Sequence, residues 1–466
     1  MNKNSKAIKS GLWYILSNLV VRGMTLITTP IFSRLLTHEQ YGAYSNFQSW
    51  MNIAVILITM RMESSLISAK FDFKDSLNRY NRTIIVLTAG MTALWAVVLN
   101  IFSGTFSNIL GFSQLYTNLL LVYCFFHAII NIFQINERYM YRYKRSVFVA
   151  LTVAISTTIV SILLVMFMQD KLTGRVVGGI LPIFLIGLLL LSYFIKDGRD
   201  IDFSAIPYTL KICIPYIPHL LSLQVLNSVD RIMITRICGS ADNALYTIAY
   251  SCGHMVTLLM TSMNSAFSPW LGDKLNEGDY KSIRRVSRYY ILIFSGLALV
   301  MMLLAPEILL IMGGSSYLEA KYVMTPVAMG CVCQFIYTLY VNVEQYQKKT
   351  VGMAFASVGA ALLNYVLNGY FIPRYGFIAA AYTTLAGYVF LLIVHMLLVR
   401  KMGMTKTYDN RFVILLVLVM FGLTLGVNYL YGHQITRYIT VAVAVAVIVF
   451  ELHKHKELLL RIVKKK

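Results

Sequence analysis

Fourteen apolar stretches, each of about 17 to 25 residues, run through the 466-residue sequence. An α-helix needs this length to cross a bilayer, and helices satisfy their own backbone hydrogen bonds inside lipid. Composition agrees, because 13% of the residues are charged, against roughly 25% in soluble domains. The sequence therefore predicts an all-α polytopic membrane protein. The predicted spans are 11–33, 43–63, 82–103, 116–135, 147–168, 176–195, 211–235, 244–268, 288–305, 323–344, 351–371, 377–399, 412–430 and 435–451.

The positions of Lys and Arg predict how these spans are oriented. In a soluble chain the net charge of +21 would suggest a nucleic-acid partner, but here the basic residues lie in short gaps between spans. With the two termini on one side, 31 of the 41 Lys and Arg fall on that side, 7 on the other and 3 within spans. Because basic loops stay in the cytoplasm, we expect cytoplasmic N- and C-termini and no nucleic-acid partner.

The motifs of several enzyme and cofactor classes are missing from the sequence. It contains no GxxxxGK[ST] phosphate loop, no HExxH and no GxSxG. Six cysteines lie almost all in apolar segments without metal-ligand spacing, which favours a packing role. The predicted outer loops are too short to form a soluble domain that could house an active site. These observations favour a transporter over an enzyme, with no metal and no cofactor.

An internal repeat predicts how the spans are grouped. The stretches SRLLTHEQYGAY (33–44) and TRICGSADNALY (235–246) both place a hydroxyl residue before an arginine, Arg34 or Arg236, at the outer end of a span. Their offset of 202 residues corresponds to six spans. An even number of spans preserves direction, so we expect two parallel six-helix lobes around a central cavity. The predicted division is 1–200 for the N-lobe, 201–400 for the C-lobe, and 401–466 for two further helices and a basic tail.

Polar residues recur in several spans at the spacing of one helix face. Two interpretations remain open, namely hydrogen bonding between helices or a hydrated cavity, where costly intramembrane ionisable groups are expected. Arg22 lies roughly 14 Å inside the first span at 1.5 Å per residue, too deep to reach the interface easily. Arg61 is expected to lie opposite the stripe that runs from Gln48 to Glu63. The candidate cavity residues are Asn18, Arg22, Arg61, Glu63, His127, Asn131, Gln224, Asn227, Arg231, His254 and Asn364.

Span seven contains the stretch LNSVDRIMITRICG, which carries charges inside an apolar region. Neighbouring residues on a helix point about 100° apart, so Asp230 and Arg231 need not pair with each other. They either line the outer mouth of a cavity or form a latch between helices. Proline permits helix bending, which suits alternating access. The candidate coupling and gating residues are Asp230, Arg34, Arg236, Pro215 and Pro218, with H⁺ or Na⁺ as the coupling ion.

Four stretches of the sequence resemble the Wzx-type polysaccharide repeat-unit flippases of the multidrug/oligosaccharidyl-lipid/polysaccharide exporter superfamily. They are SNLVVRGMTLITTPIFSRLLTHEQYGAYS, LNSVDRIMITRICGSADNALYTIAYS, YLEAKYVMTPVA and LNYVLNGYFIPRYGFIAAAYTTLAGY, and they extend from one end of the chain to the other. The resemblance implies two six-helix lobes plus two C-terminal helices. It also implies alternating access that moves a polyprenyl-diphosphate-linked oligosaccharide across the cytoplasmic (inner) membrane, for O-antigen, capsule or exopolysaccharide synthesis.

The resemblance also implies a role for Arg22, because guanidinium is the natural bidentate partner of a diphosphate. Gln224 stands at the place equivalent to Arg22 in the second lobe, so the basic pattern is not symmetric. The implied partners are the lipid-linked oligosaccharide, membrane lipids, a polysaccharide polymerase and a chain-length regulator.

Two alternatives remain. A drug/cation antiporter of the same superfamily would need an acidic, aromatic cavity, and we expect only Glu63 and Asp230 to be buried acids. An integral-membrane polymerase would need a sizeable carboxylate-bearing loop, and a scaffold protein would need no polar stripes.

Overall fold

The computed structural model describes residues 17, 20, 21, 23–73, 76–140, 142–196, 200–349 and 351–454. All regular secondary structure within these residues is helical, which confirms the predicted all-α fold class. The chain forms two compact units, residues 1–244 and residues 245–466. The three-part division expected from the sequence stays a prediction.

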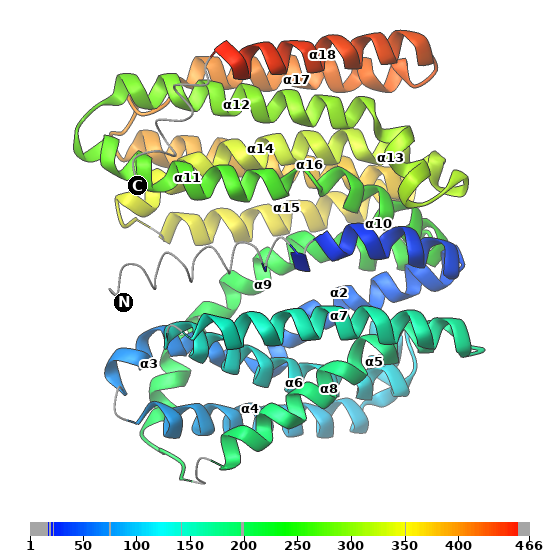
Figure 1. Cartoon of the computed structure of the whole chain (residues 1–466), viewed down its shortest axis with the longest axis vertical. Coiled ribbons are helices and arrows are strands. Elements are labelled where there is room, and N and C mark those ends of the chain that lie inside the picture. The colour runs from blue at the N-terminus through cyan, green and yellow to red at the C-terminus, as the bar shows by residue number, and fades with distance from the viewer. Residues whose placement is uncertain are drawn as a thin grey trace. The chain divides into compact units, whose positions relative to one another are not determined.

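The first unit consists of long helices joined by short turns (Figure 1). Its elements are a helix over 23–35, α2 (His38–Thr59), the 3₁₀ helix η1 (Met62–Ser65), α3 (Leu66–Asp72), α4 (Leu77–Ile101), α5 (Ser103–Leu110), α6 (Gln114–Tyr139), α7 (Tyr143–Phe167), α8 (Lys171–Lys196) and α9 (Ala205–Ile237). Helix α2 begins with a capping box. The Gln40 backbone N–H donates to the Thr37 hydroxyl at 3.2 Å, and the Thr37 backbone N–H donates to the Gln40 side chain at 3.1 Å.

Helix α2 ends in a break that sequence periodicity did not predict. Met60 and Arg61 adopt left-handed conformations, with φ of 51° and 49°, a geometry that costs about 1–2 kcal/mol per non-glycine residue. The chain bends by 59° there before it continues into η1 and α3. Hydrogen bonds hold the new direction, because the buried Tyr80 hydroxyl donates to the Ser65 hydroxyl at 2.7 Å and also bonds the Thr209 hydroxyl at 2.8 Å.

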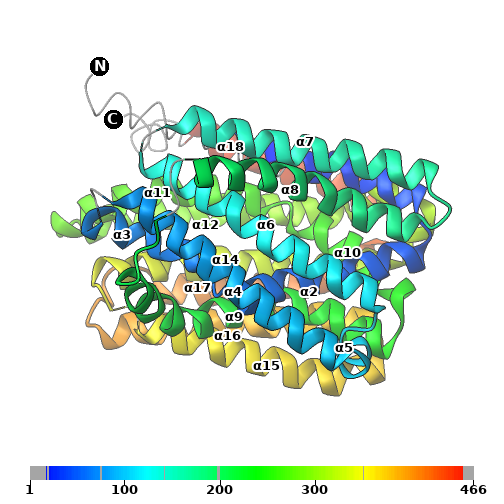
Figure 2. The same cartoon turned by 90° about the horizontal axis from the view of Figure 1, so that it is seen from below.

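Helix α10 (Ser240–His254) carries the chain from the first unit into the second. The long helices of the second unit run side by side in Figures 1 and 2, with α14 packed against both α12 and α16. Its elements are α11 (Thr257–Asn276), α12 (Tyr280–Leu303), α13 (Ala305–Met312), the 3₁₀ helix η2 (Ser315–Ala320), α14 (Lys321–Tyr346), α15 (Val351–Tyr375), α16 (Phe377–Lys401), α17 (Asn410–Leu430) and α18 (Gln434–Lys454).

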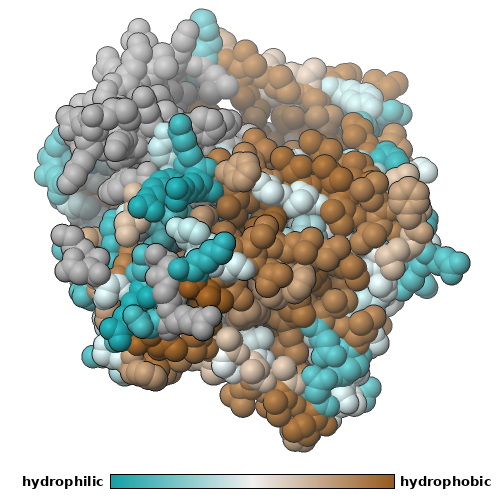
Figure 3. All heavy atoms as spheres, turned by 60° about the horizontal axis from the view of Figure 1, so that its bottom comes forward, coloured by the Kyte–Doolittle hydropathy of each residue, from teal (hydrophilic) through white to brown (hydrophobic). Residues whose placement is uncertain are grey.

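The helices agree with the predicted spans. Among the described residues, ten helices are long and apolar enough to cross a membrane, or twelve if each of two bent pairs counts as one span. Of the two remaining predicted spans, the first lies partly outside the described residues, and the eighth is divided between the 15-residue α10 and α11. Hydrophobic side chains cover much of the surface shown in Figure 3, as a lipid-facing surface requires. The chain is a multi-pass membrane protein.

Candidate functional site

A polar pocket lies inside the first unit, between membrane-spanning helices. Its volume is about 230 Å³, and its residues come from α2, the α2 break, α6 and α9. The lining residues are Asn52, Val55, Ile56, Arg61, Tyr123, His127, Leu220, Leu223, Gln224 and Asn227. The structure thus brings together four sequence-predicted residues from three segments, namely Arg61, His127, Gln224 and Asn227.

The charged group of this pocket is Arg61. Its Nε lies 3.3 Å from Oε1 of Glu63, and the two side chains are 35% and 2% exposed. The expectation that Arg61 lies opposite Glu63 is therefore wrong. Residues two apart point in opposite directions on a regular helix, but the left-handed residues Met60 and Arg61 break the helix and bring both charges to one side.

The face of α6 completes the wall around this ion pair. Asn131 Nδ2 and His127 Nδ1 lie 3.2 Å apart, one helical turn from each other. Tyr123, one turn before His127, stacks on its ring with a centroid distance of 5.0 Å. The stripe spacing that identified His127 and Asn131 could also have found Tyr123, because it lies at i−4 on the same face.

Helix α9 contributes the amides of the pocket. The Gln224 side-chain amide donates to the Ser228 hydroxyl at 2.6 Å, and the Asn227 amide donates to the Leu223 carbonyl at 2.8 Å. Each NH2 group thus donates one hydrogen bond along the helix, which orients the two side chains.

Asp230 and Arg231 lie one turn further along α9. Asp230 is buried, with 2% of its surface exposed, while Arg231 donates to the Asn227 carbonyl at 2.8 Å. Helix α9 bends by 40° between its segments Ala205–Pro218 and Leu220–Ile237, and both predicted prolines precede the bend. The two alternatives for Asp230, a gating residue and a latch between helices, both stay predictions.

The two repeat segments contact each other within the first unit. The Asn243 side chain donates to the Gly42 carbonyl at 2.9 Å, and a Cβ atom at Gly42 would collide with the Ser240 carbonyl. The repeat arginines bond to backbone carbonyls, since Arg34 donates to Pro30 at 2.8 Å and Arg236 donates to Ile109. The N-terminal ends of α2 and α10 are thus closely packed here.

Two predicted cavity residues lie in the second unit. His254 is the last residue of α10, and its Nδ1 lies 3.2 Å from the Thr257 hydroxyl. Asn364 is fully buried between α15 and α16, where its amide donates to the Thr384 hydroxyl at 3.2 Å and its oxygen accepts from Asn368 at 3.1 Å. This network matches the alternative of hydrogen bonding between helices.

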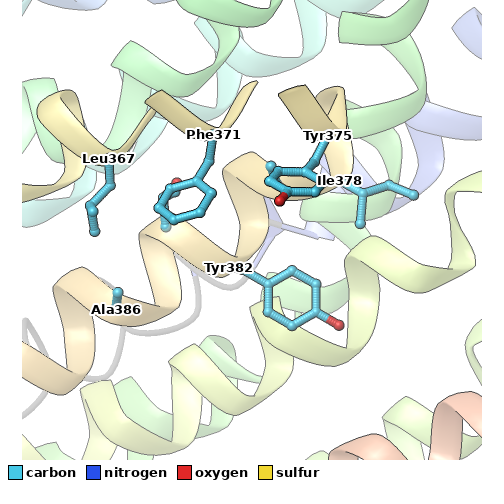
Figure 4. A pocket seen from close by; sticks show the side chains of 8 residues that line it. Leu367, Phe371, Tyr375, Ile378, Tyr382 and Ala386 are labelled. Carbon is cyan, nitrogen blue, oxygen red and sulfur yellow. The ribbon is translucent and has the colours of Figure 1, made fainter. Parts of the chain in front are cut away.

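An apolar pocket of about 530 Å³ lies beside this network, between α15 and α16. Figure 4 shows Phe371 and Tyr375 on one helix and Tyr382 on the next, with their rings around the same space. Thr383 joins pocket and network, because it lines the pocket and its hydroxyl donates to Asn368.

The expectation that only Glu63 and Asp230 are buried acids is wrong. Glu137 and Glu344 are also fully buried. Glu344 lies 2.7 Å from Nδ1 of His395, which links α14 to α16. No local pattern predicts this pair, because its partners are 51 residues apart and occur on separate helices. Arg22 and Asn18 lie outside the described residues, so their roles stay predictions.

Comparison with solved structures defines the class of fold. The lipid II flippase MurJ in an inward closed conformation superposes with a TM-score of 0.73 at 14% identity, covering 96% of this chain and 99% of that one. An inward-facing multidrug resistance MATE family transporter of the MOP superfamily superposes with a TM-score of 0.59 at 14% identity, covering 84% of this chain and 99% of that one. The fold is therefore that of MurJ and MATE membrane transporters.

Sequence comparison defines the family. The profile described as polysaccharide biosynthesis protein matches residues 7–275, and the MatE profile matches residues 215–369. The Lsg locus putative protein 1 of Haemophilus influenzae is 23% identical over 378 residues, or 77% of this chain and 89% of the relative. This chain belongs to the polysaccharide biosynthesis protein family, which confirms the resemblance found in the sequence. The proteins that share its fold are transporters, the class that the sequence predicts.

Proposed function

We propose that this protein is a flippase that moves a polyprenyl-diphosphate-linked oligosaccharide repeat unit across the cytoplasmic membrane by alternating access. The observation that carries the proposal is the polar pocket of the first unit, where Arg61, three amide-bearing residues, a histidine and a tyrosine meet inside an apolar bundle. Family membership in polysaccharide biosynthesis and a fold shared with a lipid II flippase support the proposal.

The pocket fits one polar part of such a cargo. Its volume of about 230 Å³ is below the roughly 300–1,000 Å³ of pockets that enclose a whole drug-sized ligand. It therefore suits a diphosphate or a single sugar. Arg61 offers a guanidinium with part of its surface open to the pocket, and guanidinium binds phosphate oxygens bidentately. Asn52, Gln224 and Asn227 offer the hydrogen-bonding groups that sugar hydroxyls need.

Glu63 gives this site a second function in the proposal. Its buried carboxylate balances the charge of Arg61 when no cargo is present. A diphosphate that binds Arg61 would compete with Glu63, and uptake of H⁺ or Na⁺ by Glu63 would relieve the repulsion. We therefore propose Glu63, together with Asp230, as a coupling residue. Arg22 is proposed as a second diphosphate contact on the basis of the sequence alone.

The remaining parts of the proposal concern the cellular setting. We propose location in the inner membrane with both termini cytoplasmic, on the basis of the uneven distribution of Lys and Arg. A polymerase and a chain-length regulator are proposed partners, because a translocated repeat unit must be polymerised to form a surface polysaccharide.

The test measures surface polysaccharide per folded transporter in cells that lack their own copy. Arg61→Gln combined with Glu63→Gln removes the phosphate-binding charge without leaving an unpaired carboxylate. We expect this double variant to reach the membrane in normal amounts while lipid-linked repeat units accumulate on the cytoplasmic leaflet. Arg374→Gln is the control, since Arg374 is an exposed arginine of α15 that does not line the pocket.

Arg22 is tested in the same cells. Arg22→Ala should reach the membrane normally and reduce export, while Arg22→Lys should retain part of the activity because it keeps the charge and loses the bidentate geometry. Normal export by both the double Gln variant and Arg22→Ala would refute the proposed cargo contacts. Normal polysaccharide together with lost efflux of a cationic drug would instead favour the antiporter.

A further inference from the structure

A second pocket in the second unit has a different chemistry from the sites above. Its volume is about 630 Å³, within the range of ligand-binding pockets, and it lies at the start of α12 beside the segment that precedes α17. Its lining residues are Tyr280, Lys281, Arg284, Arg285, Arg288, Tyr289, Leu292, Lys406 and Phe412. Five of the nine are cationic and none is acidic.

Two of the arginines build the pocket and hold its wall in place. Arg284 Nε donates to the Lys406 carbonyl at 2.7 Å, and Arg288 pairs with Asp409. The Asp409 carboxylate also accepts from the Phe412 backbone N–H at 3.2 Å, which caps α17. These contacts bridge segments more than 100 residues apart in the sequence, so the pocket is fixed by tertiary structure.

The other three cations have a different environment. Lys281, Arg285 and Lys406 are exposed at the pocket, and their side chains make no hydrogen bond or ion pair with the described part of the chain. Two carboxylates lie close to these cations in the sequence and both are engaged elsewhere, Asp409 by Arg288 and Asp279 by Lys274 and the Ser282 backbone N–H. Three uncompensated charges around one hollow produce a local positive potential that attracts an anion.

Part of the pocket lining is apolar, and this decides the kind of anion. Leu292 lies one helical turn after Arg288 toward the middle of the predicted span, and it is 43% exposed. Phe412 adds an aromatic ring, with the Arg288 guanidinium 5.5 Å from its centroid. A pocket that is lined by cationic groups and, one turn further along α12, by an apolar side chain matches the polarity of a lipid headgroup and its acyl chains. A free phosphate would need no apolar wall.

We propose that this pocket binds the phosphate headgroup of an anionic phospholipid in the cytoplasmic leaflet. The headgroup phosphate contacts Lys281, Arg285 and Lys406, and the upper part of an acyl chain lies against Leu292 and Phe412. Basic pockets at the cytoplasmic ends of transmembrane helices bind anionic lipids in this way. The bound lipid is separate from the cargo and joins α12 to the start of α17.

The test is native mass spectrometry of the full-length, delipidated protein titrated with dioctanoyl-phosphatidylglycerol or dioctanoyl-phosphatidylcholine. We expect saturable binding of phosphatidylglycerol and much weaker binding of phosphatidylcholine. Lys281→Gln with Arg285→Gln should weaken phosphatidylglycerol binding by about tenfold or more, since each charge-assisted contact is strong. Arg400→Gln with Lys401→Gln is the matched control, because it removes equal charge at the end of α16 outside the pocket.

Separate measurements distinguish loss of lipid binding from unfolding and from a non-specific effect of charge. Thermal unfolding in phosphatidylcholine nanodiscs should be unchanged by the pocket variant, and Lys406→Gln provides a second variant if it is not. Equal weakening by the pocket and control variants would show a non-specific charge effect and overturn the proposal. Displacement of the lipid by millimolar inorganic phosphate would show a site for a free anion and would also overturn it. Polysaccharide export by these variants is measured independently, so failure here leaves the proposed cargo site untouched.

Discussion

The Arg61–Glu63 contact allows a quantitative prediction about stability. Arg61→Gln would leave the buried Glu63 carboxylate without its counter-charge. At the observed separation of 3.3 Å, two unit charges attract by about 5 kcal/mol with an effective dielectric constant of about 20. Desolvation of both groups offsets much of this attraction.

The change in the free energy of unfolding depends on which partner of the ion pair is removed. Removing one partner of a buried ion pair costs about 3–5 kcal/mol, and we expect about 3 kcal/mol for Arg61→Gln because water reaches the arginine. Glu63→Gln should cost less, about 1 kcal/mol, because the remaining arginine keeps part of its hydration. The double variant should be more stable than Arg61→Gln alone, with a coupling energy of about 1–3 kcal/mol.

The assay is unfolding of the purified protein in mixed micelles. The free energy of unfolding is measured for the native protein, both single variants and the double variant, and the four values form a double-mutant cycle. Equal destabilisation by Arg61→Gln and by the double variant would refute the reasoning, because it would mean that the buried carboxylate does not depend on Arg61. A double variant that is stable and inactive in export would separate the structural role of the pair from cargo binding.

Three further predictions concern packing, pH and orientation. Gly178→Ala should destabilise the protein by about 1–3 kcal/mol because its Cβ would collide with the α7 backbone, while Gly179→Ala, whose nearest atom would be 3.8 Å away, should have no such effect in the same thermal unfolding assay. The pKa of Asp409 lies below its ordinary value of 3.8 because Arg288 donates to the carboxylate. The stability from this contact is therefore complete above that value and is lost as the pH falls through the lowered pKa, so Asp409→Asn should flatten the acid side of a Tm–pH profile. A cysteine placed at His433 in a cysteine-free background should react with a membrane-impermeant maleimide in intact cells, and reaction only after permeabilisation would reverse the predicted orientation.

The sequence by itself determined the membrane class, the approximate spans and several residues of the polar pocket. Partition into a bilayer depends on the summed hydrophobicity of about 20 consecutive residues, which is a local property. Helical periodicity is local as well, which is why His127 and Asn131 could be placed on one face of α6 and Gln224 and Asn227 on α9.

Tertiary structure decided which of these faces meet and which charges pair. Arg61 reaches Glu63 because the chain turns left-handed at Met60, where no glycine or proline marks a break, and contacts of the following residues with α4 and α9 hold the new direction. The basic pocket of the second unit likewise forms only when Lys406 lies beside Arg284, a residue 122 positions earlier. Such pairings depend on how whole helices pack, and a local hydrophobic pattern specifies which face of a helix is polar without specifying the helix that it will contact.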